Sequence, residues 1–559
     1  MERIQNLHFP RNFVVLFLLG SLALGALLRL MNLDVSSIWI DELNHYYAAT
    51  SYNETGEMTF PSGQPNARAK LYSVLVAYSF NMLGEGPVAV RLPSALLGIA
   101  CIGIAFWVAL RILGKHAAMI SALFVAISPF ALGWSRLSRM YTLYQALFML
   151  AAYWFYLGFE SQGKGRMAAL QENLFKTIKL SGLAEWLKSL QLNIFWLLAS
   201  AISLYLAYGV HETAALFVIG VILYSGVMVF AVPLIDGRFT LRFFKYLVVA
   251  GGLTFFLVVG YNFVPFIAEK IKFGLAFIPK WAEGTHFQNR KLYLEFLFDQ
   301  YHFPMGILFV FGAIQIFVRK NKGGLYLLML FTAYFLLFSL VFSYRHFQYL
   351  FAVYSIFTII AAYAYSFFVE FEIINIRKYW EIKSGLIKKW LVPGILILSF
   401  FWLPLTHSVR FALRIPRSAD GNYNGAQFME EWREAGNYVK VHSQPEDIIV
   451  SSDALGTYHY AGRVDFDLNF ADYDLSAEEG IINEKGNYFD LYSGAPYITT
   501  VAQMDSLTKS GQSVWLLYQA YKFNRATAFI SPELKKYVLE NYDKVLDTQN
   551  KTVVVYKSR

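Results

Sequence analysis

Eleven runs of apolar residues recur along this 559-residue chain, most of them close to the length of a membrane span. They cover approximately residues 13–31, 92–112, 116–134, 142–159, 194–210, 213–233, 246–266, 303–318, 324–342, 347–370 and 390–406. A helix needs about 20 apolar residues to cross the hydrocarbon core of a bilayer. The composition agrees, because only 16% of the residues are charged, whereas a soluble domain has about 25%. The sequence therefore predicts an α-helical polytopic membrane protein with about eleven transmembrane helices.

Residues 71–84 form a short apolar run, for which we expect a helix at the membrane surface, with a twelfth span as the alternative. The first run, residues 13–31, is not followed by a small-residue cleavage site, so we expect it to remain as a membrane anchor.

The net charge of +9 indicates membrane orientation and not nucleic-acid binding. With a cytoplasmic N-terminus, the loops assigned to the cytoplasm carry more Lys and Arg than the outer loops before residue 407, as the positive-inside rule requires. An odd number of spans then places the C-terminus outside. We expect no nucleic-acid partner, and we expect the outer loops to include a long first loop over residues 32–90.

From about residue 407 the composition becomes polar, and no further span follows. Short apolar runs that begin at Asp447, Ser513 and Thr552 are typical of buried strands, and the spacing predicts helices near 430–441 and 532–541. Strands that alternate with helices indicate an α/β domain. We therefore divide the chain into a membrane domain, 1–406, and a soluble extracytoplasmic α/β domain, 407–559.

Two adjacent carboxylates, Asp41 and Glu42, directly follow the hydrophobic pair Ile38 and Trp39 where the chain leaves the first span. Carboxylates at this depth are costly unless they face protein or a wet cavity, so they indicate a functional site. The structural alternative is that the pair caps a helix at the membrane surface. His45, one helical turn after Asp41, fits a structural role better than a catalytic one, although substrate binding remains open.

Further ionisable residues lie near span ends on the same predicted face. They are Arg91, Arg136, Arg139, His211, Glu212 and Arg345. Each has a structural alternative, because arginines at span ends often extend to lipid head groups and His211-Glu212 could cap a tight turn. A divalent metal held by Asp41, His45 and His211 also remains open, but no metal or other cofactor is required. The single cysteine, Cys101, excludes a disulfide framework, and no nucleotide-binding or hydrolase motif is present.

Three segments in the same order resemble those of the GT-C membrane glycosyltransferases, in particular family 39, the protein O-mannosyltransferase-like enzymes and their bacterial relatives. The segments are Trp-Ile-Asp-Glu, Val-Arg-Leu-Pro-Ser-Ala-Leu-Leu-Gly and Ser-Arg-Leu-Ser-Arg-Met-Tyr-Thr-Leu. The resemblance covers about residues 10–370, and more loosely the later helix that begins at Trp432. One segment departs from it: where many relatives have a His-Pro-Pro-Leu-Tyr-like sequence, this chain has Asn66-Ala-Arg-Ala-Lys-Leu-Tyr.

The resemblance implies an inverting glycosyltransferase that moves a sugar from a polyprenyl-phosphate donor to an extracytoplasmic protein, lipid or cell-surface glycan. It implies that Asp41 is the general base with Glu42 beside it, and that Arg139, Tyr141, Arg345 and Arg91 lie near the lipid phosphate. His45, His211 and Glu212 would be possible substrate-binding residues. Arginine suits a phosphate because its planar fork matches the phosphate oxygens and stays charged.

Two other functions remain open at this stage. A transporter or flippase of a lipid-linked saccharide would also need basic residues near a membrane interface, although such proteins usually have internal repeats and interrupted helices, which this sequence does not show. A protein whose outer α/β domain does the work is the third reading. The absence of lectin-like domains favours a prokaryotic plasma membrane, with the active site on the extracytoplasmic face.

Overall fold

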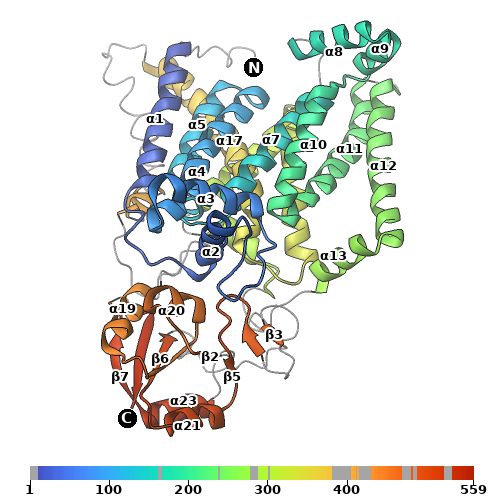
Figure 1. The fold of residues 1–559 in the computed structure, drawn as a ribbon. Coiled ribbons are helices and arrows are strands. Elements are labelled where there is room, and N and C mark those ends of the chain that lie inside the picture. Colours follow the sequence, from blue (N-terminus) through green and yellow to red (C-terminus); the bar gives the residue numbers. More distant parts are fainter. Residues whose placement is uncertain are drawn as a thin grey trace.

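The chain folds into a bundle of long helices followed by a smaller domain built on a β-sheet, as a computed structural model shows (Figure 1). The structure describes residues 10–160, 166–236, 239–276, 288–299, 302–380, 404–410, 412–413, 430–468, 480–482, 488–520, 532–549 and 551–559. A mostly helical membrane part with a small C-terminal sheet is the architecture that the sequence predicts.

Eleven of the helices in the described part of the chain make up most of the bundle. They are α1 (Arg11–Leu30), α4 (Pro87–Ile112), α5 (Lys115–Ile127), α6 (Pro129–Ser135), α7 (Tyr141–Phe159), α10 (Ile194–Val210), α11 (Leu216–Asp236), α12 (Leu241–Phe263), α15 (Phe303–Val318), α16 (Lys322–Leu336) and α17 (Phe351–Trp380). The first ten predicted spans each coincide with one or two of these helices. The predicted span 390–406 falls almost entirely on residues outside the described ones.

The described helices support a multi-pass membrane protein. By length and composition, six of them could cross a membrane, or up to eight if each of two bent pairs counts as one span. The total of eleven spans stays a prediction. The predicted span 116–134 is one of the bent pairs, because α5 and α6 meet at an angle of 59°.

Pro129 explains the break between α5 and α6, since proline lacks the N–H that would continue the helix. Ser128 caps the new helix by accepting a hydrogen bond from the N–H of Ala131 at 3.2 Å. The guanidinium of Arg29 donates to the carbonyls of Val125 and Ala126 at the end of α5, both at 3.0 Å. The chain after α6 then reaches α2 (Ile40–Thr55), where Arg139 contacts Asp41.

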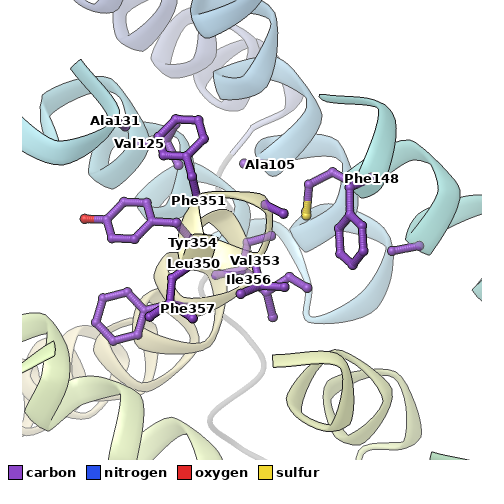
Figure 2. Close-up of a cluster of buried hydrophobic side chains, with 14 of the residues drawn as sticks. Ala105, Val125, Ala131, Phe148, Leu350, Phe351, Val353, Tyr354, Ile356 and Phe357 are labelled. Atoms are coloured by element: carbon purple, nitrogen blue, oxygen red, sulfur yellow. The ribbon is translucent and has the colours of Figure 1, made fainter. Parts of the chain in front are cut away.

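Helix α17 is the centre of the bundle. In the candidate span Phe347–Phe367, most of which belongs to α17, 89% of the most apolar part is buried inside the protein, against 22% for α1. Figure 2 shows Phe351, Tyr354 and Phe357 of α17 in the same cluster as Ala105 of α4 and Phe148 of α7. Protein-facing and lipid-facing spans have similar apolar sequences, so composition alone could not predict this difference.

Further helices lie between the spans. They are α2 (Ile40–Thr55), α3 (Lys70–Leu83), α8 (Arg166–Thr177), α9 (Ser181–Ser189), η2 (Glu212–Ala215), α13 (Pro265–Ala276), α14 (Leu292–Leu297), η5 (Leu337–Val341) and η6 (Phe347–Leu350). The helix predicted over 71–84 is confirmed as α3. Helices α2 and α3 lie at the end of the bundle that faces the sheet domain, whereas α8 and α9 lie at the opposite end (Figure 1).

The sheet domain contains a six-stranded sheet in the order β5-β2-β1-β6-β8-β7. Its strands are β1 (Ile448–Ser451), β2 (Phe466–Leu468), β5 (Tyr497–Ile498), β6 (Val514–Gln519), β7 (Tyr542–Asp547) and β8 (Val553–Ser558), and β3 (Gly480–Ile482) and β4 (Tyr488–Asp490) form a separate pair. Strands β5, β2, β1 and β6 run parallel to one another. Strand β8 is antiparallel to β6, and β7 is antiparallel to β8. The three predicted strands are confirmed as β1, β6 and β8.

Among the described residues of this domain there are four helices: α19 (Trp432–His442), α20 (Ala454–Ala461), α21 (Val501–Thr508) and α23 (Pro532–Asn541). Two of them, α19 and α23, match the predicted helices. Ser408 and Ala412, however, pack on the bundle, because Ser408 Oγ donates to the carbonyl of Ile127 at 2.6 Å and Ala412 is buried beside Leu28 and Leu132. Two residues just after the predicted boundary at 406/407 therefore still contact the bundle.

Candidate active site

Helix α2 begins at the acidic pair and gives its two members different surroundings. Asp41 and Glu42 occupy the first turn of α2, where negative charge is stabilised by the helix dipole. The Glu42 side chain also accepts a hydrogen bond from the N–H of Trp39 at 3.0 Å, which closes the start of the helix. Glu42 is fully buried, whereas the Asp41 side chain is 34% exposed. Only Asp41 therefore has an open side from which a substrate could approach.

Glu42 forms a buried ion pair with Arg91 of α4. Arg91 Nε and Nη2 donate to the two Glu42 carboxylate oxygens at 2.8 and 2.7 Å, and the N–H of Ser138 donates to Glu42 at 2.7 Å. Burial raises the pKa of Glu42, but the charge and hydrogen bonds of Arg91, with the N–H groups of Trp39 and Ser138, outweigh burial and lower it. Glu42 is thus held as a carboxylate whose oxygens are engaged.

Arg91 also binds the loop between α1 and α2. Its Nη1 donates to the carbonyls of Leu33 and Ser36 at 2.6 and 3.2 Å, and its Nη2 donates to the carbonyl of Ser37 at 2.7 Å. With the two bonds to Glu42, all of its N–H groups are used inside the protein, and the side chain is 1% exposed. The structure therefore does not support Arg91 as a ligand of the donor phosphate.

Asp41 pairs with Arg139, which lies in the loop between α6 and α7. Arg139 Nη2 is 3.2 Å from Asp41 Oδ2, and Arg139 Nη1 donates to the Asp41 backbone carbonyl at 3.0 Å. The Arg139 guanidinium also lies over the rings of Trp39 and Tyr141, 5.8 and 5.6 Å from their centres. Burial lowers the pKa of Arg139, but the Asp41 charge, together with the contributions of Tyr141 and Tyr492, outweighs burial and raises it, so the guanidinium stays charged.

The backbone of Arg139 is fixed to α4. Ser94 Oγ donates to the Arg139 carbonyl at 2.9 Å, and the Tyr72 hydroxyl contacts Ser94 Oγ at 2.6 Å. Tyr141, the first residue of α7, is buried and packs edge-on against Trp134. Asp41, Arg139 and Tyr141 are therefore brought together, from α2, the α6–α7 loop and α7.

His45 lies in the contact between α2 and α3 and not on the open side of Asp41. Its Nδ1 is 2.9 Å from Ser73 Oγ, and its ring packs edge-on against Tyr72. Burial lowers the pKa of His45 to about 3, and the Arg139 charge adds to this effect. His45 is thus a neutral, packed side chain, which favours the structural reading.

His211 and Glu212, at the turn between α10 and α11, have different contacts. His211 Nδ1 is 2.7 Å from Thr213 Oγ1 and also accepts from the Thr213 N–H, so it caps η2, and its ring stacks on Tyr144. Glu212 is exposed and pairs with Lys270 of α13 at 2.7 Å. The capping role expected as the alternative for this turn is what the structure shows.

Arg345 is buried in the segment between η5 and η6. Its Nε donates to the Ser339 carbonyl at 3.2 Å, and its Nη1 donates to the carbonyls of Gln288 and Ser343 at 2.9 and 3.2 Å. These bonds turn the guanidinium towards backbone carbonyls. A phosphate role for Arg345 would use the remaining nitrogen, Nη2.

Two further residues bear on the site and were not candidates from the sequence. Arg68 is an exposed side chain before α3. Burial is the main cause that lowers the pKa of His211 to about 4, and the charges of Arg139 and Arg68 lower it further, whereas the Glu212 charge opposes them. Burial and the neighbouring tyrosines raise the pKa of Tyr344, and the nearby Asp41 carboxylate adds to this effect. Arg68 lies within the segment that departs from the family pattern, and that departure was the available signal.

A metal site at the acidic pair is not supported. Among the residues that the structure describes, no three His, Cys, Asp or Glu side chains come together in a group that could hold a metal ion. His45 Nδ1 and His211 Nδ1 are instead occupied by Ser73 and Thr213.

Comparison with known proteins identifies the fold. A family model described as dolichyl-phosphate-mannose-protein mannosyltransferase matches residues 68–170. The structure of ArnT from Cupriavidus metallidurans bound to undecaprenyl phosphate is similar with a TM-score of 0.56 and 13% identity over 98% of both chains. The archaeal oligosaccharyltransferase AglB from Archaeoglobus fulgidus, in complex with an inhibitory peptide and a dolichol-phosphate, gives a TM-score of 0.58 and 12% identity over 97% of this chain and 74% of that chain.

No curated protein matches the chain. The matched region, residues 68–170, extends from the loop before α3 through α7 and contains Arg91, Arg139 and Tyr141. The structural matches extend over nearly the whole chain, the sheet domain included. The chain has the GT-C fold of the membrane glycosyltransferases.

Proposed function

We propose that the protein is an inverting glycosyltransferase that moves a sugar from a polyprenyl-phosphate donor to an acceptor on the extracytoplasmic side of the membrane. The observation that carries the proposal is the pair of Asp41 and Arg139: a partly exposed carboxylate held in place by a guanidinium. The fold supports it, because ArnT is similar in structure and its structure contains bound undecaprenyl phosphate.

Asp41 is the general base in this proposal. Its carboxylate takes the proton of the acceptor nucleophile while the nucleophile attacks the anomeric carbon from the face opposite the phosphate. The bond between the anomeric carbon and the phosphate oxygen breaks, and its electron pair leaves with the polyprenyl phosphate. A general base must lie within about 3 Å of the proton it accepts, and Asp41 is the member of the acidic pair with an exposed side.

Cationic residues near Asp41 stabilise the departing phosphate. Arg139 is the best placed, and the exposed Arg68 adds a second positive charge that acts on both Tyr141 and His211. Glu42 and Arg91 have a different part, because their mutual ion pair and hydrogen bonds fix the start of α2 and the loop before it. Arg345 remains a candidate phosphate ligand through Nη2, with Tyr141 as the ring beside Arg139.

The direct test uses purified protein in lipid nanodiscs with defined polyprenyl-phosphate sugars. Release of free polyprenyl phosphate that depends on an added acceptor supports the transferase, and a panel of peptide, glycan and lipid acceptors identifies the acceptor class. AglB was solved with a peptide, so peptides are the first acceptors to try. Movement of the intact lipid-linked saccharide between leaflets, without release of polyprenyl phosphate, would instead support a flippase.

A further inference from the structure

A short loop between α1 and α2, residues 33–38, is held from two sides by arginines of different parts of the protein. From the bundle, Arg91 donates to the carbonyls of Leu33, Ser36 and Ser37. From the sheet domain, Arg433 Nη2 donates to the carbonyls of Asp34 and Ser36 at 3.0 and 2.9 Å. The Ser36 carbonyl therefore accepts hydrogen bonds from both arginines.

Three further contacts join the sheet domain to the same loop. The backbone N–H of Arg433 donates to Ser37 Oγ at 3.2 Å, and Ser37 Oγ donates to Glu431 at 3.3 Å. The N–H of Ile38 donates to the hydroxyl of Tyr460 at 2.6 Å. The loop is thus fixed by both backbone and side-chain contacts up to Ile38, only three residues before Asp41.

Arg433 and Tyr460 belong to a rigid part of the sheet domain. Arg433 is the second residue of α19, whose Trp432 and Val439 are fully buried against the sheet. Tyr460 is near the end of α20, which packs on α19 and also on α2. On α2 itself, the Tyr47 hydroxyl meets His459 Nδ1 at 3.1 Å. The position of this domain is therefore transmitted directly to the first turns of α2.

We propose that Arg433 is a positioning residue for Asp41, so that the sheet domain completes the active site from outside the membrane bundle. The inference rests on the proposed function, in which Asp41 must meet the acceptor proton within about 3 Å. A shift of about 1 Å at such a group can cost about 100-fold in rate. Loss of the Arg433 contacts frees the Asp34 carbonyl and one side of the Ser36 carbonyl, and so loosens the loop before Asp41.

The test compares Arg433→Ala with Arg463→Ala in the full-length protein in nanodiscs. Arg463 is a matched control, because it also donates to two backbone carbonyls, those of Gln444 and Pro445, but both lie within the sheet domain. Arg433→Ala should speed hydrogen exchange in the peptide 33–45 and lower kcat about 10- to 100-fold. The KM for the donor should stay within about twofold, since the proposed phosphate ligands lie in the bundle. Arg463→Ala should change neither exchange in this peptide nor kcat.

Two further variants keep the inference testable if Arg433→Ala fails to fold. Arg433→Lys keeps the charge but has no planar fork to bridge two carbonyls, so it should restore kcat only in part. Tyr460→Phe removes the acceptor of the Ile38 N–H with little change in volume, and exchange at Ile38 should rise.

Four outcomes decide the matter. The inference is overturned if exchange in 33–45 is unchanged in these variants, if exchange rises while kcat stays at the wild-type value, or if Arg463→Ala has the same effects as Arg433→Ala. If the wild-type protein transfers no sugar to any acceptor, the proposed function fails, but the exchange data still decide whether Arg433 holds the loop.

Discussion

Arg139 holds Asp41 at two points, with Nη2 at 3.2 Å from the carboxylate and Nη1 at 3.0 Å from the backbone carbonyl of the same residue. Two contacts from one planar group fix both the depth of the α2 N-terminus and the direction of the Asp41 side chain. Arg139 is itself fixed through Ser94 of α4. The general base and the proposed phosphate ligand are therefore parts of one rigid unit.

Replacing Arg139 should affect both binding of the donor and the rate. A charge-assisted hydrogen bond is worth about 1.5–3 kcal/mol, which corresponds to a loss of about 10- to 150-fold in kcat/KM for the donor in Arg139→Ala. Arg139→Lys should recover part of this loss, because one ammonium group cannot make both contacts to Asp41. Steady-state kinetics with a purified polyprenyl-phosphate sugar measure it.

The control for Arg139 is Arg136→Lys, a change three residues earlier in a side chain that donates to backbone carbonyls of Leu28 and Asn32. Its effect should appear in thermal stability and not in KM for the donor. If the folded Arg139→Ala protein keeps wild-type donor kinetics, Arg139 is only a structural residue.

Glu42→Gln should destabilise the protein more than it changes the chemistry. The substitution leaves the Arg91 charge buried without its carboxylate, and breaking a buried pair in this way typically costs about 3–5 kcal/mol. Thermal unfolding in detergent should show a clearly lower Tm. Glu172→Gln, which breaks the exposed pair with Lys176 on α8, should leave Tm nearly unchanged. A Glu42→Gln protein with normal Tm and no turnover would instead assign the proton-accepting role to Glu42.

Stability should fall as the pH is lowered, first because of His45. The folded-state pKa of His45 is about 3, so between the usual value near 6.5 and pH 3 the unfolded chain binds a proton that the folded protein does not. Glu42 acts at lower pH: its folded-state pKa is below the ordinary value, so its stabilising pair is complete above about pH 4.3 and is lost as the pH falls through the lower folded-state pKa.

A His45→Asn variant tests the first of these effects. It keeps a polar atom for Ser73 but cannot be protonated, so the decrease in Tm between pH 6.5 and 5 should be smaller than in the wild type. The pH dependence of kcat over the same range should not change, because His45 takes no part in proton transfer. A changed pH–rate profile would contradict the structural assignment of His45.

Membrane orientation is open to a direct test. Eleven spans place the C-terminal domain and the α2 N-terminus outside, and the segment near 376–389 inside. Reporter fusions at the C-terminus and in this segment should therefore report opposite sides of the membrane. If both reporters are on the same side, the number of spans is wrong, and the extracytoplasmic location of Asp41 has to be reconsidered.

The fold was largely predictable because each level has a strong sequence signal. Runs of about 20 apolar residues have one structural solution in a bilayer, and the strands β1, β6 and β8 are apolar enough to be recognised without their neighbours. The break between α5 and α6 was missed, although Pro129 marks it, because the two helices together have the length of one span. The burial of α17 was not predictable, since lipid and protein interiors select similar side chains.

The contacts between the candidate residues were not predictable from the sequence. Asp41 and Arg139 meet in the structure, but the sequence could not assign Arg91 to Glu42, because the two residues are 49 positions apart and only the packing of α2 on α4 brings them together. The same holds for Arg433, which lies nearly 400 positions from the carbonyls of Asp34 and Ser36. The sequence around a charged residue at a span end does not show whether its side chain binds a lipid head group, a substrate or a backbone carbonyl.

Asp41→Asn is the decisive substitution for the proposed mechanism. Asparagine has nearly the same size and keeps an oxygen that can accept from Arg139, so the start of α2 should remain folded, but the amide cannot take the acceptor proton. Turnover should fall by about 100- to 10,000-fold, the usual contribution of general acid–base catalysis. Donor binding should remain within a few-fold of the wild-type value. Single-turnover assays and equilibrium binding with the same polyprenyl-phosphate sugar separate these two quantities.

Asp505→Asn serves as the control for this change, because Asp505 is a carboxylate on α21 of the sheet domain and pairs with Lys509 there. It should retain full turnover. Asp41→Glu should also be strongly impaired, since one additional methylene group moves the carboxylate away from a proton that must lie within about 3 Å. Near-normal turnover of a well-folded Asp41→Asn protein would exclude Asp41 as the base, and activity lost only in Glu42→Gln would transfer that role to Glu42.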